Sequence, residues 1–150
     1  MSYQPILPAT GLVGWNLLTR TMATQRSTFD ASPDIVRDTD YFEAKIGEIE
    51  TAAELVSDRR LLRVALGAFG LGDDINNRAF VQRVLEDGSI DEGALANRLT
   101  DSRYKAFAKA FGFGDFDTPR TVLSDFGPEI TARFRRQSFE IAVGEQDDSL

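Results

Sequence analysis

The sequence predicts an all-α protein, a multi-helix bundle that contains an internal duplication of helical units. Apolar residues recur at helical spacing along most of the 150 residues, and sustained strand-type alternation is missing. One glycine-containing octet also occurs twice, as GAFGLGDD at residues 67–74 and as KAFGFGDF at residues 109–116. We therefore expect one all-α domain over residues 11–150, preceded by a flexible N-terminal segment over residues 1–10.

The first two helices are indicated by apolar stripes and by one start signal. The first stripe consists of Leu12, Trp15, Leu18, Met22 and Phe29. Ser32 followed by Pro33 is typical of an N-cap with proline at the first helical position. The second stripe lies after this signal and shares one helix face: Ile35, Phe42, Ile46 and Ile49.

The later helices are indicated mainly by their start signals. Two pairs of residues have the spacing of a capping box, and two segments open with a proline-containing signal. In chain order these are Thr51 with Glu54, Ser89 with Glu92, Thr118-Pro119, and Gly127-Pro128-Glu129. We expect the last two signals to open the last two segments of the chain.

The duplication is indicated by the residues around the two octets. Alignment of Phe69 with Phe111 gives an offset of 42 residues. At this offset two stripes of helical spacing match: Leu62, Ala65, Leu66 and Phe69 in the first copy, and Tyr104, Phe107, Ala108 and Phe111 in the second. Small and large residues exchange places between the copies, which keeps the packed volume similar. Two copies are too few for a solenoid, so we expect one bundle.

The glycines of the octet could either bind a phosphate or end a helix. Phosphate-binding loops place glycines between a strand and a helix N-terminus, whereas these glycines follow a predicted helix. We expect Gly70 and Gly112 to adopt positive φ at helix C-termini, with Leu71 and Phe113 packed back on the helix. The octet is therefore predicted to terminate helices.

The residue types also restrict the chemistry. The chain contains 0 histidines and 0 cysteines, which excludes histidine bases, thiolate nucleophiles and zinc sites built on either residue. Asp58 and Asp101, which precede arginine-rich helix starts, could form a carboxylate pair for acid–base chemistry. Helix capping or ion pairing is the simpler explanation of both. We predict no catalytic residue, no cofactor and no metal ion.

The net charge of −7 disfavours nucleic acid as a partner, because nucleic acid binding requires positive charge. Two arginine clusters are best explained as solvated helix faces or as partners of carboxylates: Arg59, Arg60 and Arg63, and Arg133, Arg135 and Arg136. The N-terminal residues lack a basic region and are broken by prolines and glycines. We therefore expect no secretory signal peptide and no membrane span.

Phenylalanine is concentrated toward the C-terminus, with seven of the 11 between Phe107 and Phe139. The hydrophobic core explains most of them. Phe113, Phe116 and Phe126 fall near predicted turns, where an apolar side chain can instead reach a partner. These three are the candidate interface residues.

The chain from about Leu12 to Gln146 resembles an uncharacterised bacterial domain-of-unknown-function family. The likeness lies in YFEAKIGEIETAAELVSDRRLLRVALGAFGLGDDI and in LANRLTDSRYKAFAKAFGFGD. Members are often encoded beside flagellar genes, which implies a non-enzymatic structural or adaptor role with a flagellar component as protein partner. Members also continue with a further apolar helix, so this chain is either a short member or shortened at its C-terminus.

Two alternatives stay open from the sequence. One is an enzyme with a cleft of carboxylates and arginines between the two helical units. The other is a self-associating helical protein, a homo-oligomer, of unrelated role. The compartment is also open, since the resemblance is consistent with a cytoplasmic protein and with export by the flagellar route.

Overall fold

A computed structural model describes residues 12–148, with side chains from residue 21 to residue 144. The predicted flexible segment, residues 1–10, lies outside the described residues. Within the described range the chain forms eight α-helices, three 3-10 helices and no strand, which confirms the all-α prediction. In chain order these are α1 (Leu12–Asp30), α2 (Pro33–Lys45), η1 (Ile46–Glu48), α3 (Ala52–Ser57), α4 (Arg59–Gly67), η2 (Gly72–Asn76), α5 (Arg78–Asp87), α6 (Leu95–Arg98), α7 (Ser102–Phe111), η3 (Arg120–Val122) and α8 (Phe126–Asp148).

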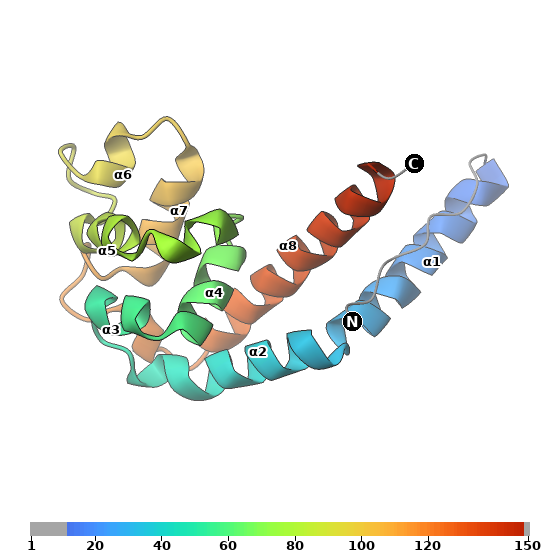
Figure 1. Cartoon of the computed structure of the whole chain (residues 1–150), viewed down its shortest axis with the longest axis horizontal. Coiled ribbons are helices and arrows are strands. Elements are labelled where there is room, and N and C mark those ends of the chain that lie inside the picture. Colours follow the sequence, from blue (N-terminus) through green and yellow to red (C-terminus); the bar gives the residue numbers. More distant parts are fainter. Residues whose placement is uncertain (1–11, 149–150) are drawn as a thin grey trace.

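The helices form a body and a two-helix extension (Figure 1). The body consists of α3 to α7, α2 passes along one side of it, and α8 runs out of it. α1 extends in the same direction as the outer part of α8. Phe29 of α1 meets Phe139 of α8 edge-to-face, with ring centroids 5.6 Å apart. Both side chains are buried, so this contact anchors α1 to α8.

α4 is the central helix of the body. Its apolar residues are almost completely buried: Leu61, Leu62, Val64, Ala65 and Leu66. α2, α3 and α8 pack around it, and its arginines remain exposed. Phe69, just beyond α4, meets Phe107 of α7 edge-to-face at 5.5 Å between ring centroids. The two predicted stripes therefore line one continuous core.

Two of the predicted start signals lie at helix starts. α2 begins at Pro33 after an extended Ser32, although the Ser32 hydroxyl makes no capping hydrogen bond. The Thr51 hydroxyl accepts from the amide of Glu54 at 3.1 Å, and the Glu54 carboxylate accepts from the amide of Thr51 at 3.1 Å. This is a complete capping box at the start of α3.

The capping box predicted at Ser89 and Glu92 is wrong. The amide and the hydroxyl of Ser89 both donate to the carboxylate of Asp115, and the next helix begins only at Leu95. A carboxylate distant in sequence thus binds the amide that Glu92 would accept from in a capping box, and it also binds the hydroxyl. Thr118-Pro119 likewise opens only the short η3, whereas α8 does start at the Gly127-Pro128 signal, with Phe126 as its first residue.

The first octet ends a helix, as predicted. Gly70 has φ of +73°, the amide of Leu71 donates to the carbonyl of Leu66 at 2.9 Å, and the amide of Gly70 donates to the carbonyl of Gly67 at 3.2 Å. These are the two hydrogen bonds of a Schellman motif. Because the amides of Gly70 and Leu71 are already bonded within the helix end, they are not offered to a phosphate.

The second octet also ends a helix, with a simpler geometry. Gly112 has φ of +72° and its amide donates to the carbonyl of Ala108 at 3.0 Å, which is the αL type of cap. Phe113 stacks on Phe111 with ring centroids 5.8 Å apart. Both octets therefore terminate helices. The internal duplication behind them stays a prediction.

Candidate interaction surfaces

The three candidate interface residues lie in different environments. Phe126 is only 3% exposed and packs edge-to-face on Phe111, so its side chain belongs to the core. It is the first residue of a buried helix face, which a position beside a turn does not reveal. Phe113 is half-buried, stacked on the same ring of Phe111. Phe116 is 53% exposed and is the candidate whose side chain remains at the surface.

Two further exposed apolar residues lie in the same connection as Phe116. Val122 and Leu123 are 41% and 50% exposed, and the sequence reasoning missed both. A signal was present, since they form an apolar pair outside any helical stripe. Val122 lines two hollows of about 130 and 300 Å³. Phe116 lines neither hollow, but it belongs to the same connection between α7 and α8. We call Phe116, Val122 and Leu123, with these hollows, the α7–α8 surface.

The backbone of this connection is fixed at two points. Asp115 Oδ1 accepts from the amides of Ser89 and Ile90 at 2.7 and 3.2 Å, and Asp115 Oδ2 accepts from the Ser89 hydroxyl at 2.6 Å. At the other end, the buried Thr121 donates its hydroxyl to the carbonyl of Ile49. Phe116 and Val122 are therefore adjacent to residues whose positions are set by contacts with the body.

The same contacts act on the charge of Asp115. Burial raises the pKa of its carboxyl group, but the hydrogen bonds from Ser89 and Ile90 outweigh burial, so the pKa lies below its ordinary value. The carboxylate is thus the form that holds the 88–90 loop. Gly114, the preceding residue, lies against the backbone of Gly88, where a Cβ would be 2.6 Å from the Gly88 nitrogen.

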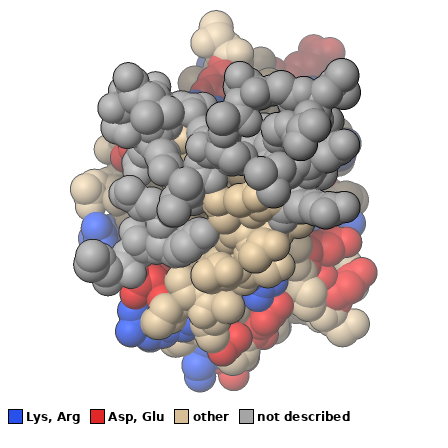
Figure 2. All heavy atoms as spheres, turned by 90° about the vertical axis from the view of Figure 1, so that its right-hand side faces the viewer, with Lys and Arg blue, Asp and Glu red and all other residues tan. Residues whose placement is uncertain are grey.

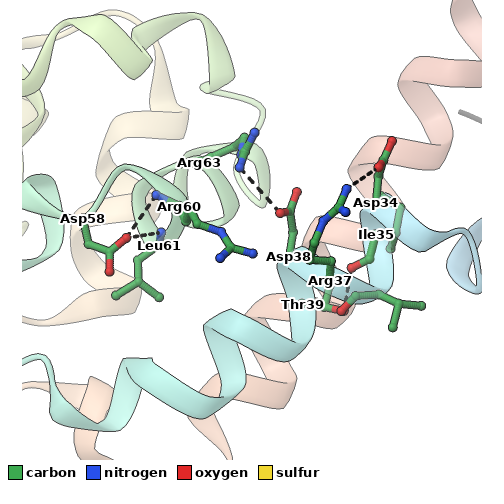
Figure 3. Close-up of polar contacts among 10 residues, drawn as sticks. Asp34, Ile35, Arg37, Asp38, Thr39, Asp58, Arg60, Leu61 and Arg63 are labelled. Atoms are coloured by element: carbon green, nitrogen blue, oxygen red, sulfur yellow. Dashed lines mark hydrogen bonds and ion pairs between the residues drawn. The ribbon is translucent and has the colours of Figure 1, made fainter. Parts of the chain in front are cut away.

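A second surface, which we call the arginine groove, lies between α2 and α4. It is a hollow of about 510 Å³ lined by Asp34, Arg37, Asp38, Arg60 and Arg63. Arg60 and Arg63 point from α4 toward α2 (Figure 3). Arg63 approaches Asp38 at 3.5 Å, and Arg37 pairs with Asp34 at 2.6 Å.

Arg60 is held by an aromatic ring. Its guanidinium lies over the ring of Tyr41 at 4.2 Å from the centroid. The Tyr41 hydroxyl donates to Asp58 Oδ2 at 2.7 Å, which raises the pKa of Tyr41, with a further increase from burial. Asp58 Oδ1 accepts from the amides of Arg60 and Leu61, which caps α4. The carboxylate of Asp58 therefore caps α4 and also positions the ring of Tyr41 beneath Arg60.

Asp58 and Asp101 are both helix caps. The carboxylate of Asp101 accepts from the amide of Arg103 at 3.0 Å and pairs with its guanidinium at 2.6 Å. These hydrogen bonds lower the pKa of Asp101. Each candidate carboxylate thus caps its own helix, Asp58 at α4 and Asp101 at α7. No group of three or more acidic residues that could hold a metal ion occurs in the described part of the chain.

The arginines around the first octet have structural partners. Arg103 donates to the carbonyl of Gly70 at 2.6 Å. Arg133 donates to the carbonyl of Ala68 at 3.1 Å and lies over the ring of Phe69. Cations placed at these carbonyls stabilise the C-terminal end of α4. Tyr104 donates to Asp74 at 2.7 Å, and this hydrogen bond, with burial, raises the pKa of Tyr104 to about 12.

The face that the extension presents carries charges of both signs. Among the described residues in Figure 2, acidic and basic side chains lie below and beside an area of uncharged residues. Among the described helices, none has the length and apolar character that crossing a membrane requires.

The two candidate surfaces are the apolar α7–α8 surface and the arginine groove. They lie toward opposite ends of α2, the groove at Asp34–Asp38 and the α7–α8 surface at Glu43 and Ile46.

Comparison with known proteins places the chain in a family. A crystal structure of protein AGR_C_984 from Agrobacterium tumefaciens has a similar fold, with a TM-score of 0.79 and 26% sequence identity over 97% of this chain. This chain spans 66% of the length of that protein. A search of curated proteins found no match. The model of a family described as a protein of unknown function (DUF1217) matches residues 68–150, more than half of the sequence, and the chain belongs to this family.

Proposed function

We propose that the protein is a non-enzymatic structural or adaptor protein of the bacterial flagellum, which acts by binding another protein through the α7–α8 surface. The observation that carries this proposal is the exposure of Phe116, Val122 and Leu123 on one short connection that is fixed at Asp115 and Thr121. Apolar side chains on a preordered backbone bind a partner with little loss of conformational entropy.

The resemblance to a family encoded beside flagellar genes supports the flagellum as the location. The use of Asp58 and Asp101 as helix caps supports a role without catalysis, because these were the carboxylates best placed by sequence for acid–base chemistry. The groove that does combine arginines and carboxylates lies between α2 and α4, and no residue of the second matched stripe, Tyr104 to Phe111, lines it.

The test is affinity capture from the native cell with two matched double variants. Phe116→Ser with Val122→Ser alters the α7–α8 surface, where the residues are 53% and 41% exposed. Ile141→Ser with Val36→Ser is the control, since these residues are 54% and 39% exposed on other helices. We expect the wild type and the control to recover a flagellar or export component identified by mass spectrometry, and the surface variant to lose it.

Motility supplies a second measurement. A strain that carries the surface variant should swim less well than one that carries the control. Normal swimming of a deletion strain, together with no flagellar protein recovered by the wild type, would contradict the proposal. Light scattering across a concentration series covers the remaining outcome: a particle that grows with concentration only when the α7–α8 surface is intact would make this surface a contact between copies instead.

A further inference from the structure

We propose that the arginine groove binds an acidic segment of a partner protein, whose carboxylates pair with Arg60 and Arg63. The groove lies near the opposite end of α2 from the α7–α8 surface, so this inference is independent of the proposed flagellar role. Three arginines and two aspartates line the hollow, so it is locally positive in a protein whose net charge is −7.

The groove's own carboxylates leave Arg60 and Arg63 available. Arg63 reaches Asp38 only at 3.5 Å, longer than the roughly 2.7–2.9 Å of a strong charge-assisted hydrogen bond. Its side chain is 55% exposed, and exposed ion pairs of this kind are weak enough to exchange partners. Arg60 has no carboxylate within ion-pair distance in the part of the chain that the structure describes.

The ring of Tyr41 orients Arg60 for such a contact. A guanidinium that stacks on an aromatic face keeps its N–H groups at the edge, where they can bind a carboxylate with two parallel hydrogen bonds. Tyr41 is itself fixed by its hydrogen bond to Asp58. Arg60 therefore loses little side-chain freedom on binding, and Tyr41 is a positioning residue for it.

Carboxylates on a protein segment fit this groove better than a nucleic acid does. Asp34 and Asp38 line the groove, and together with the acidic whole they repel a continuous chain of phosphates. Separate carboxylates on a protein segment can pair with the arginines without lying next to Asp34 and Asp38. Asp38 has only 16% of its side chain exposed, so Arg63 rather than Asp38 dominates the accessible part of that pair. The open groove also suits an extended segment that covers it from outside.

The test uses nuclear magnetic resonance of the arginine Nε–H groups in the intact chain, with hexaglutamate as probe. We expect saturable shifts for Arg60 and Arg63 and none with hexaglutamine. Arg60→Gln and Arg63→Gln should each weaken binding about threefold, and about tenfold together, as expected for half-exposed charge pairs. Arg59→Gln is the matched control, because Arg59 is also on α4 but bonds Asn76 instead.

The positioning role of Tyr41 has its own readout. Tyr41→Leu should move the Arg60 Nε–H resonance in the free protein, because the ring current above the guanidinium is lost, and should weaken hexaglutamate binding. Tyr41→Phe keeps the ring but loses the hydrogen bond to Asp58, so it should retain most of the resonance position and weaken binding less than Tyr41→Leu does. Circular dichroism confirms that each variant is folded.

Several results would overturn the inference. Equal shifts at Arg59 and at Arg83, which pairs with Asp87 on α5 at 3.8 Å, would show unspecific attraction. An equal response to hexaglutamine would exclude a carboxylate site. If inorganic phosphate saturates the shifts of Arg60 and Arg63 at the same concentration as hexaglutamate or a lower one, the groove is a site for small anions. Tighter binding of a thymidine hexanucleotide would indicate a nucleic acid site.

Discussion

The two glycine octets share five of eight residues but differ in what they do after ending a helix. The first closes α4 inside the body, where Arg103 and Arg133 bind its carbonyls and its last residue, Asp74, accepts from Tyr104. The second leads α7 to the surface, and its last residue, Phe116, is exposed. The shared glycines Gly70 and Gly112 end the two helices, whereas the residues that follow them lie in different surroundings.

The second glycine of each octet shows the same contrast. Gly72 lies in open space, since a Cβ there would meet nothing within 4 Å. Gly114 lies against α5, where a Cβ would be 2.6 Å from the Gly88 nitrogen and 2.9 Å from the Asp87 carbonyl carbon. The second octet is thus a packing contact as well as a turn.

The largest expected effect is therefore at Gly114. Gly114→Ala should reduce the free energy of unfolding by about 3 kcal/mol, because the backbone of Gly88 cannot move aside without detaching the 88–90 loop. Gly72→Ala should change it by about 0.5 kcal/mol or less, or stabilise slightly. Urea unfolding of both variants measures the difference. Equal losses for the two would show that the octets are not distinguished by packing.

The next largest effect is expected at the positive-φ glycine that both octets place at the helix end. Gly70→Ala and Gly112→Ala should each reduce the free energy of unfolding by about 1–2 kcal/mol, because both glycines have φ above +70° and alanine is strained there. Chemical denaturation of each single variant checks this. A loss at one position only would show that just one octet needs a glycine to end its helix.

A smaller effect is expected at the aspartates of the octets. Asp115→Asn should reduce the free energy of unfolding by about 1 kcal/mol. The side-chain oxygen of asparagine accepts hydrogen bonds from Ser89 and Ile90 less strongly than the carboxylate of Asp115 does. Asp73→Asn is the matched control, since Asp73 accepts no hydrogen bond from another segment within the described range. Thermal unfolding at neutral pH compares the two.

This prediction has a defined pH dependence. The pKa of Asp115 is lowered in the folded protein, so its contribution is present above the ordinary pKa of aspartate, about 4, and is lost as pH falls through the lower folded value. The difference in stability between wild type and Asp115→Asn should therefore shrink in acid. A difference that stays constant to low pH would mean that the charge of Asp115 does not hold the loop.

The smallest effect concerns Asp74 of the first octet. Tyr104→Phe removes the hydrogen bond that Tyr104 donates to Asp74. Below pH 10 this should reduce the free energy of unfolding by about 0.5–1 kcal/mol. Because the pKa of Tyr104 is raised to about 12, this contribution is present below the ordinary tyrosine pKa, about 10, and is lost as pH rises through the folded value. Ultraviolet titration should show a late-ionising tyrosine that Tyr104→Phe removes. A titration unchanged by this substitution would contradict the assignment.

Local signals explain why much of the fold was predictable from sequence. The Thr51–Glu54 box and the two glycine caps depend on residues within one or two helical turns, and all three are confirmed. Features that depend on tertiary contacts were missed. Ser89 follows the local rule for a cap, but Asp115 reaches it from a distant segment, and Phe126 begins a buried helix face.

The candidate surfaces were less predictable for the same reason. Phe116 was identified because its turn is visible in the sequence. The apolar pair Val122 and Leu123 is visible in the sequence, but its exposure depends on how η3 lies against η1, and the pair alone does not show that. The arginine groove requires α2 and α4 to be neighbours, so clustered arginines on α4 alone did not indicate Asp38 or Tyr41 as their counterparts.

The central position of α4 has a practical consequence for the family. The family match begins at Ala68, directly after Gly67 ends α4, yet one hydrophobic cluster joins residues on both sides of that point. A polypeptide that started at residue 68 would carry α8 without α4, the central helix on which α8 packs. Recombinant versions of this family should therefore begin upstream of α2. A chimera joined at residue 68 would divide one hydrophobic core between two parent proteins and would not transfer an independently folding unit.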